Sequence, residues 1–255
     1  MDTSWQKASR WYGKIVGEEG HYFHQKIVIP KVLELLKLKN GERLLDVACG
    51  NGVMARSIQK EVDYTGVDLA KGLIRQAEEM DRNRGHRYMV ADVTKEIPGE
   101  DKFDKAIIIL ALQNIKEPEK TIKLVSERLV TGGKLMIVLN HPCFRIPRQS
   151  SWEMDEGNKM QYRRINRYLS PLEVPLNVHP SQRRGPITWS YHRPLSNYTK
   201  MLTESNMLIE NLEEWASDKK SEGSAAKMEN RAREEFPMFL AIYAIKREPE
   251  AIMQL

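Results

Sequence analysis

A short apolar strand runs directly into a glycine-rich turn within residues 43–58, which read RLLDVACGNGVMARSI. The strand ends in Asp46, and the turn that follows holds small residues at Ala48, Gly50 and Gly52. Glycine has no Cβ, so the backbone of such a turn can adopt strained dihedral angles and let a ligand lie on its amide groups. An amphipathic helix is expected next, and its N-terminus would add partial positive charge. The segment predicts a nucleotide-cofactor site at a strand end.

The glycines alone leave two cofactor classes open, because GNGVMA also satisfies the G-x-G-x-x-A fingerprint of nicotinamide enzymes. Asp46 can brace the turn and attract an ammonium group, whereas it would repel a pyrophosphate. Asp68 ends the next strand, where a carboxylate can accept both ribose hydroxyls of a nucleoside. Asp92 follows the third strand, where an acid can accept a hydrogen bond from an adenine amino group. Three successive strand ends therefore each carry an acid.

Strands and helices alternate along the first part of the chain, which predicts a parallel sheet with helices on both faces. Residues 107–110 are apolar at consecutive positions, as in a central strand that is covered on both sides. Pro118 is expected to begin a helix and Gly132-Gly133 to end it. The predicted strands are 43–48, 64–67, 87–91, 105–110, 134–140, 207–212 and 238–245, and the predicted helices are 5–16, 28–38, one from about 53, 70–81, 118–129 and 195–204.

In order and spacing, five segments resemble the class I S-adenosylmethionine-dependent methyltransferases. The resemblance covers residues 10–140 and 195–246. The similar segments are LLDVACGNG for the first motif, YTGVDLAKGLI for the second strand and ribose-binding acid, YMVADV for the adenine-contacting segment, FDKAIIILALQNI for the fourth strand and LVTGGKLMIVLNH for the fifth. Ala48 stands where the family's first glycine usually is, and alanine is the smallest alternative.

The resemblance implies S-adenosylmethionine as the cofactor and a Rossmann-like α/β fold. This fold has a mostly parallel seven-stranded sheet, helices on both faces and an antiparallel C-terminal strand pair, whereas a nicotinamide fold would continue with further βαβ units. The cofactor residues that it implies lie at strand ends and in the N-terminal segment: Tyr12, Tyr22, Asp46, Ala48, Gly50, Gly52, Asp68, Leu69, Asp92, Val93 and Leu110. His21, beside Tyr22, is expected to help cover the cofactor.

The 255 residues, 41% of them hydrophobic, suffice for the core of one α/β domain with an insertion. We expect an N-terminal helical cap over 1–40, a cofactor-binding core over 41–140, a substrate lid inserted over 141–194, and a C-terminal helix and strand pair over 195–246. A long aperiodic insertion in a compact domain is commonly a lid or a binding loop. The charged run 216–235 is expected to be a solvated excursion.

The insertion is basic and aromatic. Ten Lys or Arg residues, among them Arg145, Arg183 and Arg184, stand against four acids between His141 and Lys200, and seven aromatic rings are interleaved with them. This composition suits a planar or anionic small molecule, and it also suits a looped or single-stranded nucleic acid. Three hypotheses stay open: a small-molecule O-, N- or C-methyltransferase, an RNA or protein methyltransferase that uses the basic insertion, and a noncatalytic S-adenosylmethionine-binding module. The (D/N)PPY-like signature of amino-methylating enzymes is absent after the fourth strand, which favours the first.

Three side chains near the ends of the insertion are candidates for catalysis. His141 directly follows the fifth strand, and an imidazole can accept a proton near neutral pH. The same histidine can equally be a hydrogen-bonded loop anchor. His192 and the adjacent Tyr191 are the next candidates. The two histidines of HYFHQ have metal-like spacing, yet no third ligand is nearby in the sequence, so no metal site is expected.

The remaining composition bears on compartment. The longest uncharged apolar run, 106–112, is far shorter than the ~20 residues that cross a bilayer, and the N-terminal residues lack the pattern of a signal peptide. Only Cys49 and Cys143 occur, too few for a disulfide framework. We therefore expect a cytoplasmic protein without a membrane partner; its oligomeric state is left open.

Overall fold

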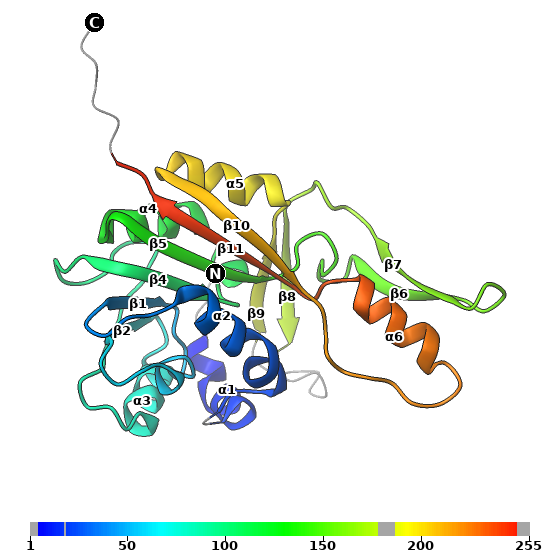
Figure 1. Cartoon of the computed structure of the whole chain (residues 1–255), viewed down its shortest axis with the longest axis horizontal. Coiled ribbons are helices and arrows are strands. Elements are labelled where there is room, and N and C mark those ends of the chain that lie inside the picture. Colours follow the sequence, from blue (N-terminus) through cyan, green and yellow to red (C-terminus); the bar gives the residue numbers. More distant parts are fainter. Residues whose placement is uncertain (1–4, 18, 178–186, 249–255) are drawn as a thin grey trace, which may run out of the picture.

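The computed structural model describes residues 5–17, 19–177 and 187–248 (Figure 1). Seven strands form one sheet in the order β10-β11-β5-β4-β1-β2-β3; β11 runs antiparallel to both of its neighbours, β10 and β5, and the other adjacent pairs are parallel. This sheet confirms the predicted mostly parallel architecture with an antiparallel C-terminal pair. The strands are β1 (Arg43–Val47), β2 (Asp63–Asp68), β3 (Arg87–Val90), β4 (Phe103–Ile109), β5 (Leu129–Asn140), β10 (Met207–Trp215) and β11 (Phe239–Lys246).

The strand order reverses between β1 and β4. Leu45 of β1 pairs with Thr65 of β2 on one side and with Ala106 of β4 on the other, and both pairings are parallel. From β1 the chain first builds outward through β2 and β3 and then returns to add β4 and β5 on the opposite side. In open α/β sheets, ligands bind outside the carboxyl ends of the strands at such a switch point. The topology therefore places the expected site above β1 and β4.

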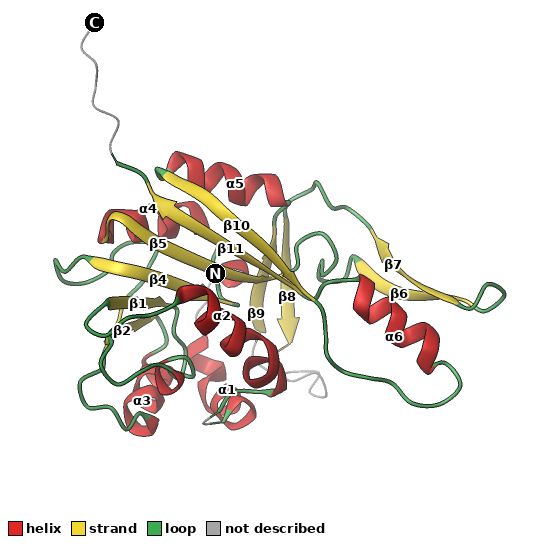
Figure 2. Ribbon diagram, viewed as in Figure 1, coloured by secondary structure: helices red, strands yellow, loops and turns green. Residues whose placement is uncertain are grey.

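Helices cover both faces of the sheet (Figure 2). Ile108 of β4 lies in one core with Ile122 and Leu202, whereas its neighbour Ile107 lies in a second core with Val32 on the opposite face. All five side chains are fully buried, and burial of both Ile107 and Ile108 is expected for a central strand. The α-helices are α1 (Ser9–Val16), α2 (Ile29–Leu36), α3 (Lys71–Met80), α4 (Pro118–Arg128), α5 (Leu195–Glu204) and α6 (Ala226–Glu235).

The α-helix predicted from about Val53 is wrong. Only a single 3-10 turn, Ala55–Ser57, follows the glycine-rich turn, and the backbone is extended again at Ile58. The Arg56 guanidinium folds back to donate a 2.5 Å hydrogen bond to the Asn51 carbonyl, so the side chain satisfies a group that a longer helix would use. The partial charge of a helix N-terminus is consequently not available to a ligand at this turn.

The proposed role of Gly132-Gly133 as a helix stop is also wrong, because both residues lie inside β5. Helix α4 ends earlier, at Arg128, whose guanidinium donates hydrogen bonds to the carbonyls of Ile97 and Asp101 at 2.8 and 2.9 Å. A Cβ at Gly133 would lie 2.7 Å from the Val130 carbonyl oxygen, so this glycine permits a tight path of the strand.

The insertion after β5 contains two hairpins where we expected an aperiodic loop. They are formed by β6 (Ser150–Asp155) with β7 (Met160–Ile165) and by β8 (Leu172–Asn177) with β9 (Ile187–His192). The charged run 216–235, expected to be a solvated excursion, instead contains α6, which packs against β7 (Figure 1). Arg183 and Arg184 lie outside the described residues.

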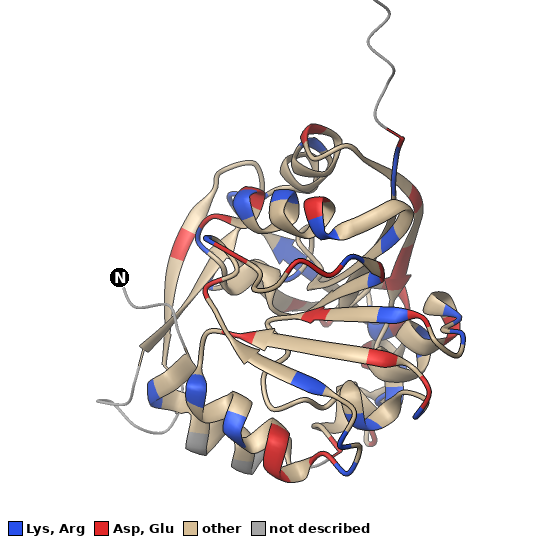
Figure 3. Cartoon of the chain, turned by 90° about the vertical axis from the view of Figure 1, so that its left-hand side faces the viewer, with Lys and Arg blue, Asp and Glu red and all other residues tan. Residues whose placement is uncertain are grey.

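Charged residues of both signs are spread over the helices and the strand ends in the view of Figure 3, where the middles of the strands are mostly uncharged. Across 5–17, 19–177 and 187–248, no helix combines the length and the apolar composition that a bilayer crossing requires.

Candidate functional site

A cavity of about 600 Å³ opens outside the carboxyl ends of the parallel strands, at the switch point between β1 and β4. Residues from five strand ends line it together with the N-terminal segment and the insertion. Among the predicted cofactor residues, those that line the cavity are Tyr12, Ala48, Gly50, Asp68, Leu69, Asp92, Val93 and Leu110. Volumes of about 300 to 1,000 Å³ are usual for small-molecule sites. The structure thus brings eight of the eleven predicted residues together around one cavity.

The turn after β1 is held in a ligand-binding shape by its own dihedral angles and by Asp68. Ala48 and Gly50 both have positive φ, at +56° and +58°. One carboxylate oxygen of Asp68 accepts a 3.0 Å hydrogen bond from the Gly50 amide, and the other accepts a 2.8 Å bond from the Ala70 amide. A positive φ in a residue with a Cβ is a strained conformation that clusters at functional sites. The end of β2 therefore positions the turn after β1.

Gly52, by contrast, does not line the cavity. Its φ is +72°, and a Cβ there would lie 2.9 Å from the Tyr88 hydroxyl oxygen and 3.0 Å from the Ala77 Cβ. A Cβ at Gly50 would meet nothing closer than a Tyr12 ring carbon at 3.7 Å. The two glycines consequently have different roles. Gly52 allows close packing of the turn against α3 and β3, and Gly50 faces the cavity.

Two buried carboxylates lie beneath the turn. Asp46 accepts a 2.8 Å hydrogen bond from the Tyr64 hydroxyl and lies behind the cavity wall rather than in it. Burial raises the pKa of Asp46 to about 7, the Tyr64 hydrogen bond opposes this rise, and nearby Asp68 adds to it. Burial also raises the pKa of Asp68, against the lowering effect of its two amide hydrogen bonds. Within the described residues neither acid forms an ion pair, so a cationic ligand would relieve their repulsion.

Asp92 lies at the rim of the cavity. One of its oxygens accepts hydrogen bonds from the Thr94 amide and hydroxyl at 3.1 and 2.7 Å, and Lys95 approaches the other to 3.4 Å. Burial raises the pKa of Asp92 somewhat, but the Thr94 and Lys95 interactions outweigh it and lower the pKa overall. The carboxylate is therefore ionised and oriented, as an acceptor for an amino group must be.

Leu110, at the end of β4, is a second strained residue of the cavity wall, with φ of +52°. Its carbonyl oxygen accepts hydrogen bonds from the side-chain amides of Gln113 and Asn114 at 2.8 and 3.4 Å. Both amides also line the cavity. This short segment thus fixes the cavity wall at the end of β4.

The N-terminal segment closes another side of the cavity with Tyr12, His21 and His24. The two imidazoles stack at 4.1 Å, and burial lowers the pKa of both, to about 4 for His24. Tyr22 does not line the cavity; its hydroxyl donates a 2.9 Å hydrogen bond to Asp218 and the residue is 40% exposed. We did not single out His24 as a cofactor residue, although its spacing from His21 was visible in HYFHQ.

The three catalytic candidates do not line the cavity. His141 is buried, with Nε2 lying 2.6 Å from Glu214 and Nδ1 accepting a 3.2 Å hydrogen bond from the Cys143 amide. His192 Nε2 donates a 2.7 Å bond to the Tyr168 carbonyl. The ring of Tyr191 is buried beneath the Arg193 guanidinium. Both nitrogens of His141 are therefore engaged, which is the arrangement of a loop anchor.

The end of β5 and the insertion contribute the remaining wall, with the polar side chains of Asn140 from β5 and of Arg145 and Ser190 from the insertion. Asn140 and Arg145 lie close in sequence to His141. Sequence position therefore located this wall of the cavity correctly, but it did not show which side chains face the cavity. A strand end exposes alternate residues to opposite sides, and sequence alone does not say which of them faces a cavity.

The acidic side chains around the cavity fit the cofactor that the sequence resemblance implies. Asp68 has lone pairs left for a diol, Asp92 can accept a hydrogen bond from an amino group, and the two buried acids Asp46 and Asp68 suit a cationic ligand, which favours their ionised forms, rather than a pyrophosphate. Among the side chains of the described residues, no group of three or more His, Cys, Asp or Glu is arranged to hold a metal ion.

Comparison with known proteins agrees with this geometry. Residues 21–173 match the family described as "Methyltransferase domain". A ubiquinone biosynthesis O-methyltransferase of Chromobacterium violaceum is 31% identical over 99 residues, which are 36% of this chain and 42% of that protein. The chain spans about half the length of the curated relatives it matches.

Two solved structures extend the similarity over most of the chain. An S-adenosylmethionine-dependent methyltransferase from Mesorhizobium loti is 25% identical, with a TM-score of 0.66 over 84% of this chain and 96% of that one. One from Clostridium acetobutylicum, at 17% identity, shares the fold with a TM-score of 0.60 over 96% and 99% of the two chains.

Proposed function

We propose that the methyl acceptor of this protein is a small, planar or anionic organic molecule. The chain belongs to the family of S-adenosylmethionine-dependent methyltransferases, and its cofactor is S-adenosylmethionine. The observation that carries the proposal is that one and the same cavity presents Asp68 and Asp92 on one side and is built by the insertion on another. A cofactor and a small acceptor can meet there without opening the fold.

On the cofactor side, Asp68 would hold the ribose hydroxyls, Asp92 the adenine amino group, and the turn at Ala48 and Gly50 the amino-acid portion. The cofactor would supply an electrophilic methyl group: the acceptor atom would attack the methyl carbon in line, and S-adenosylhomocysteine would leave as the neutral thioether. The protein's part is to hold that atom about 3 to 3.5 Å from the methyl carbon and to exclude water. Neutral His21 and His24 can cover the site without repelling a cation.

On the acceptor side, the wall combines apolar Pro147 and Leu176 with polar Asn140 and Ser190. Such a wall suits an organic molecule with a few polar groups. The relative from Chromobacterium violaceum, an O-methyltransferase of ubiquinone biosynthesis by its name, supports a small organic acceptor for this chain as well.

The test is transfer of a radiolabelled methyl group from S-adenosylmethionine to a panel of phenols, amines and aromatic carboxylates, with total RNA and total protein assayed in parallel. We expect label in the small-molecule fraction. Label only in RNA or protein would contradict the proposal, and so would cofactor binding without transfer to any of the three fractions. Asp63→Asn is the matched control for substitution of Asp68, because Asp63 is exposed at the other end of the same strand. This variant should transfer the methyl group as the wild type does.

A further inference from the structure

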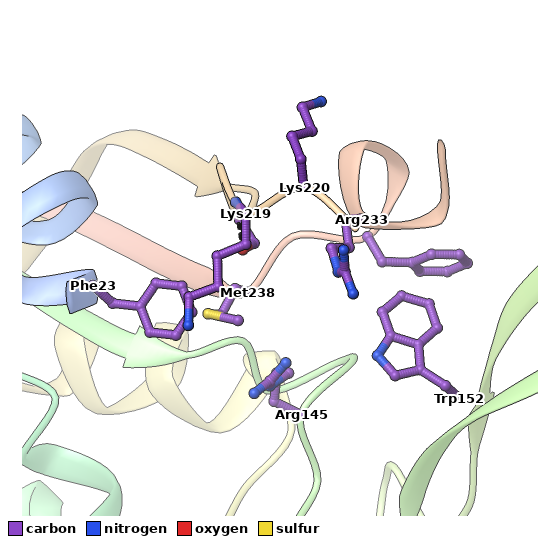
Figure 4. A pocket seen from close by; sticks show the side chains of 9 residues that line it. Phe23, Arg145, Trp152, Lys219, Lys220, Arg233 and Met238 are labelled. Carbon is purple, nitrogen blue, oxygen red and sulfur yellow. Dashed lines mark hydrogen bonds between the residues drawn. The ribbon is translucent and has the colours of Figure 1, made fainter. Parts of the chain in front are cut away.

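A second cavity of about 200 Å³ adjoins the first and shares Phe23, Arg145 and Met238 with it. Figure 4 shows it between the N-terminal segment, the insertion and α6. We call it the basic side pocket; its lining residues are Phe23, Arg145, Trp152, Ser217, Lys219, Lys220, Arg233, Phe236 and Met238. Three segments that lie far apart in the sequence therefore meet at one side of the proposed methyl-transfer site.

The pocket is lined by four cations and no acid. Two of the cations have carboxylate partners outside the pocket: Lys220 pairs with Glu234, and Arg233 pairs with Glu229 at 3.4 Å. The other two, Arg145 and Lys219, form no ion pair within the described residues. Figure 4 shows Arg145 and Arg233 reaching into the same space, whereas Lys220 points out of it.

The guanidinium of Arg163 adds a further positive charge near Arg145. Arg163 is fixed by hydrogen bonds to the Phe144 carbonyl and the Ser150 hydroxyl at 2.8 and 2.9 Å, and it stacks on Trp152 at 5.1 Å. Burial lowers the pKa of both arginines, and the charge of Arg145 lowers that of Arg163 further. Arg145 is partly buried and has no ion pair within the described residues, and such a charge is unfavourable until an anion joins it.

The walls of the basic side pocket are aromatic. Phe236 contacts Trp152 in a T-shaped arrangement with 5.5 Å between ring centroids, and Lys219 lies 4.9 Å from the Phe23 ring centroid on the opposite side. Flat apolar surfaces beside cationic groups favour an anion attached to a ring over a free, fully hydrated ion.

We propose that the basic side pocket binds an anionic group of the methyl acceptor, a carboxylate or a phosphate, with Arg145 and Lys219 as its counterions. This inference rests on the proposed function, since it assigns the acceptor's anion to a place beside the methyl-transfer cavity. Arg145 lines both cavities, so an acceptor held there by its anionic end would extend into the larger one. The pocket would thus select anionic acceptors over neutral analogues.

The test is calorimetric titration of benzoate and, separately, of inorganic phosphate into the full chain saturated with S-adenosylhomocysteine. We expect saturable binding at one site for at least one of the two probes, and the preferred probe distinguishes a carboxylated from a phosphorylated acceptor. Loss of a charge-assisted hydrogen bond should weaken that binding about 10- to 100-fold in Arg145→Gln and in Lys219→Gln. Arg164→Gln is the matched control, because Arg164 lies exposed on β7 beside Glu153 and should leave the affinity unchanged.

Titration of S-adenosylhomocysteine into Arg145→Gln should give the wild-type affinity, which shows that the variant is folded and that Arg145 does not serve the cofactor. The inference is overturned if neither probe binds saturably, if Arg145→Gln binds the preferred probe as tightly as the wild type, or if that variant also loses S-adenosylhomocysteine. Failure of the proposed function has a different signature: no labelled methyl group is transferred, while the anion still binds in the Arg145-dependent manner.

Discussion

The Tyr64 hydroxyl donates a 2.8 Å hydrogen bond to the Asp46 carboxylate, and both side chains are buried beneath the turn that follows β1. Burial outweighs this hydrogen bond and raises the pKa of Asp46 from 3.8 to about 7. The folded protein therefore holds a proton that the unfolded chain releases at lower pH. This raised pKa makes both the stability of the fold and the charge beneath the cofactor turn depend on pH near neutrality.

The first prediction follows from the sign of that shift. Because the folded state binds the Asp46 proton more tightly, the Asp46 contribution to the free energy of unfolding falls as pH rises from about 4 to about 7 and is constant above. Asp46→Asn keeps the hydrogen-bond acceptor for Tyr64 but cannot ionise. Its free energy of unfolding should therefore lack the decrease of about 1 kcal/mol per pH unit that Asp46 contributes in the wild type. Urea unfolding between pH 5 and pH 8 measures it. Equal slopes for the variant and the wild type would contradict the assignment, and exposed Asp63→Asn is the control.

A second prediction separates the two glycines of the turn. Gly52→Ala should lower the free energy of unfolding by about 1 to 3 kcal/mol, because the new Cβ meets Tyr88 and Ala77 at a positive φ. Gly50→Ala carries the same positive-φ strain, but its Cβ has room and faces the cavity, so it should destabilise the fold less than Gly52→Ala and should also weaken cofactor binding. Thermal unfolding and calorimetry of both variants decide the matter. The reverse pattern, with Gly50→Ala the less stable variant, would disagree with the structure.

A third prediction concerns His141. If it anchors the loop through Glu214 and the Cys143 amide, His141→Ala should cost about 1 to 3 kcal/mol of stability and change kcat by less than about threefold. A general base would behave differently, since its loss lowers kcat about 10²- to 10⁴-fold with cofactor affinity intact. Glu214→Gln, which keeps an acceptor for Nε2, should be milder than His141→Ala. A large fall in kcat at unchanged stability would restore His141 as the base.

The sequence was sufficient to predict those positions at which few residue types meet the physical requirement. The acids at strand ends and the small residues of the turn were predicted from the needs of a nucleoside ligand, and the structure gathers Gly50, Asp68 and Asp92 at one cavity; their roles toward ribose and adenine stay predictions. Consecutive apolar residues such as Ile107 and Ile108 likewise have no other stable place than a strand covered on both faces.

Prediction failed where tertiary contacts decide. The apolar positions around Val53 fit a helix, yet the short connection to β2 and the Arg56 hydrogen bond leave only a 3-10 turn. The hairpins of the insertion were missed for two reasons. Most side chains of β6 and β7 are only partly buried or exposed, so Trp152 and its neighbours show no hydrophobic alternation. β9 is mostly buried, but its buried residues include polar Thr188 and Ser190. The side chain of His141 is turned away from the cavity by Glu214, which is distant in sequence.

A fourth prediction tests the insertion as a substrate lid against the alternative of an RNA platform. Several exposed arginines that neutralise six to ten phosphates would make RNA affinity fall about 10³- to 10⁵-fold between 50 and 200 mM salt. We expect instead weak binding to total RNA and slower proteolysis of the insertion when S-adenosylhomocysteine is present. Tight, salt-sensitive RNA binding that is lost in Arg163→Ala/Arg164→Ala would contradict the lid, as would an insertion cleaved equally fast with and without ligand.

The most direct measurement of the central claim is calorimetric titration of S-adenosylmethionine, S-adenosylhomocysteine and NAD into the wild type, Asp68→Asn and Asp63→Asn. The first two ligands should bind the wild type and Asp63→Asn alike. Asp68→Asn should lose affinity on the order of 10²-fold or more, because it would weaken the two charge-assisted hydrogen bonds that we propose to the ribose, each worth about 1.5 to 3 kcal/mol. NAD should not bind in the micromolar range. Unchanged affinity in Asp68→Asn, or micromolar binding of NAD by the wild type, would contradict the account.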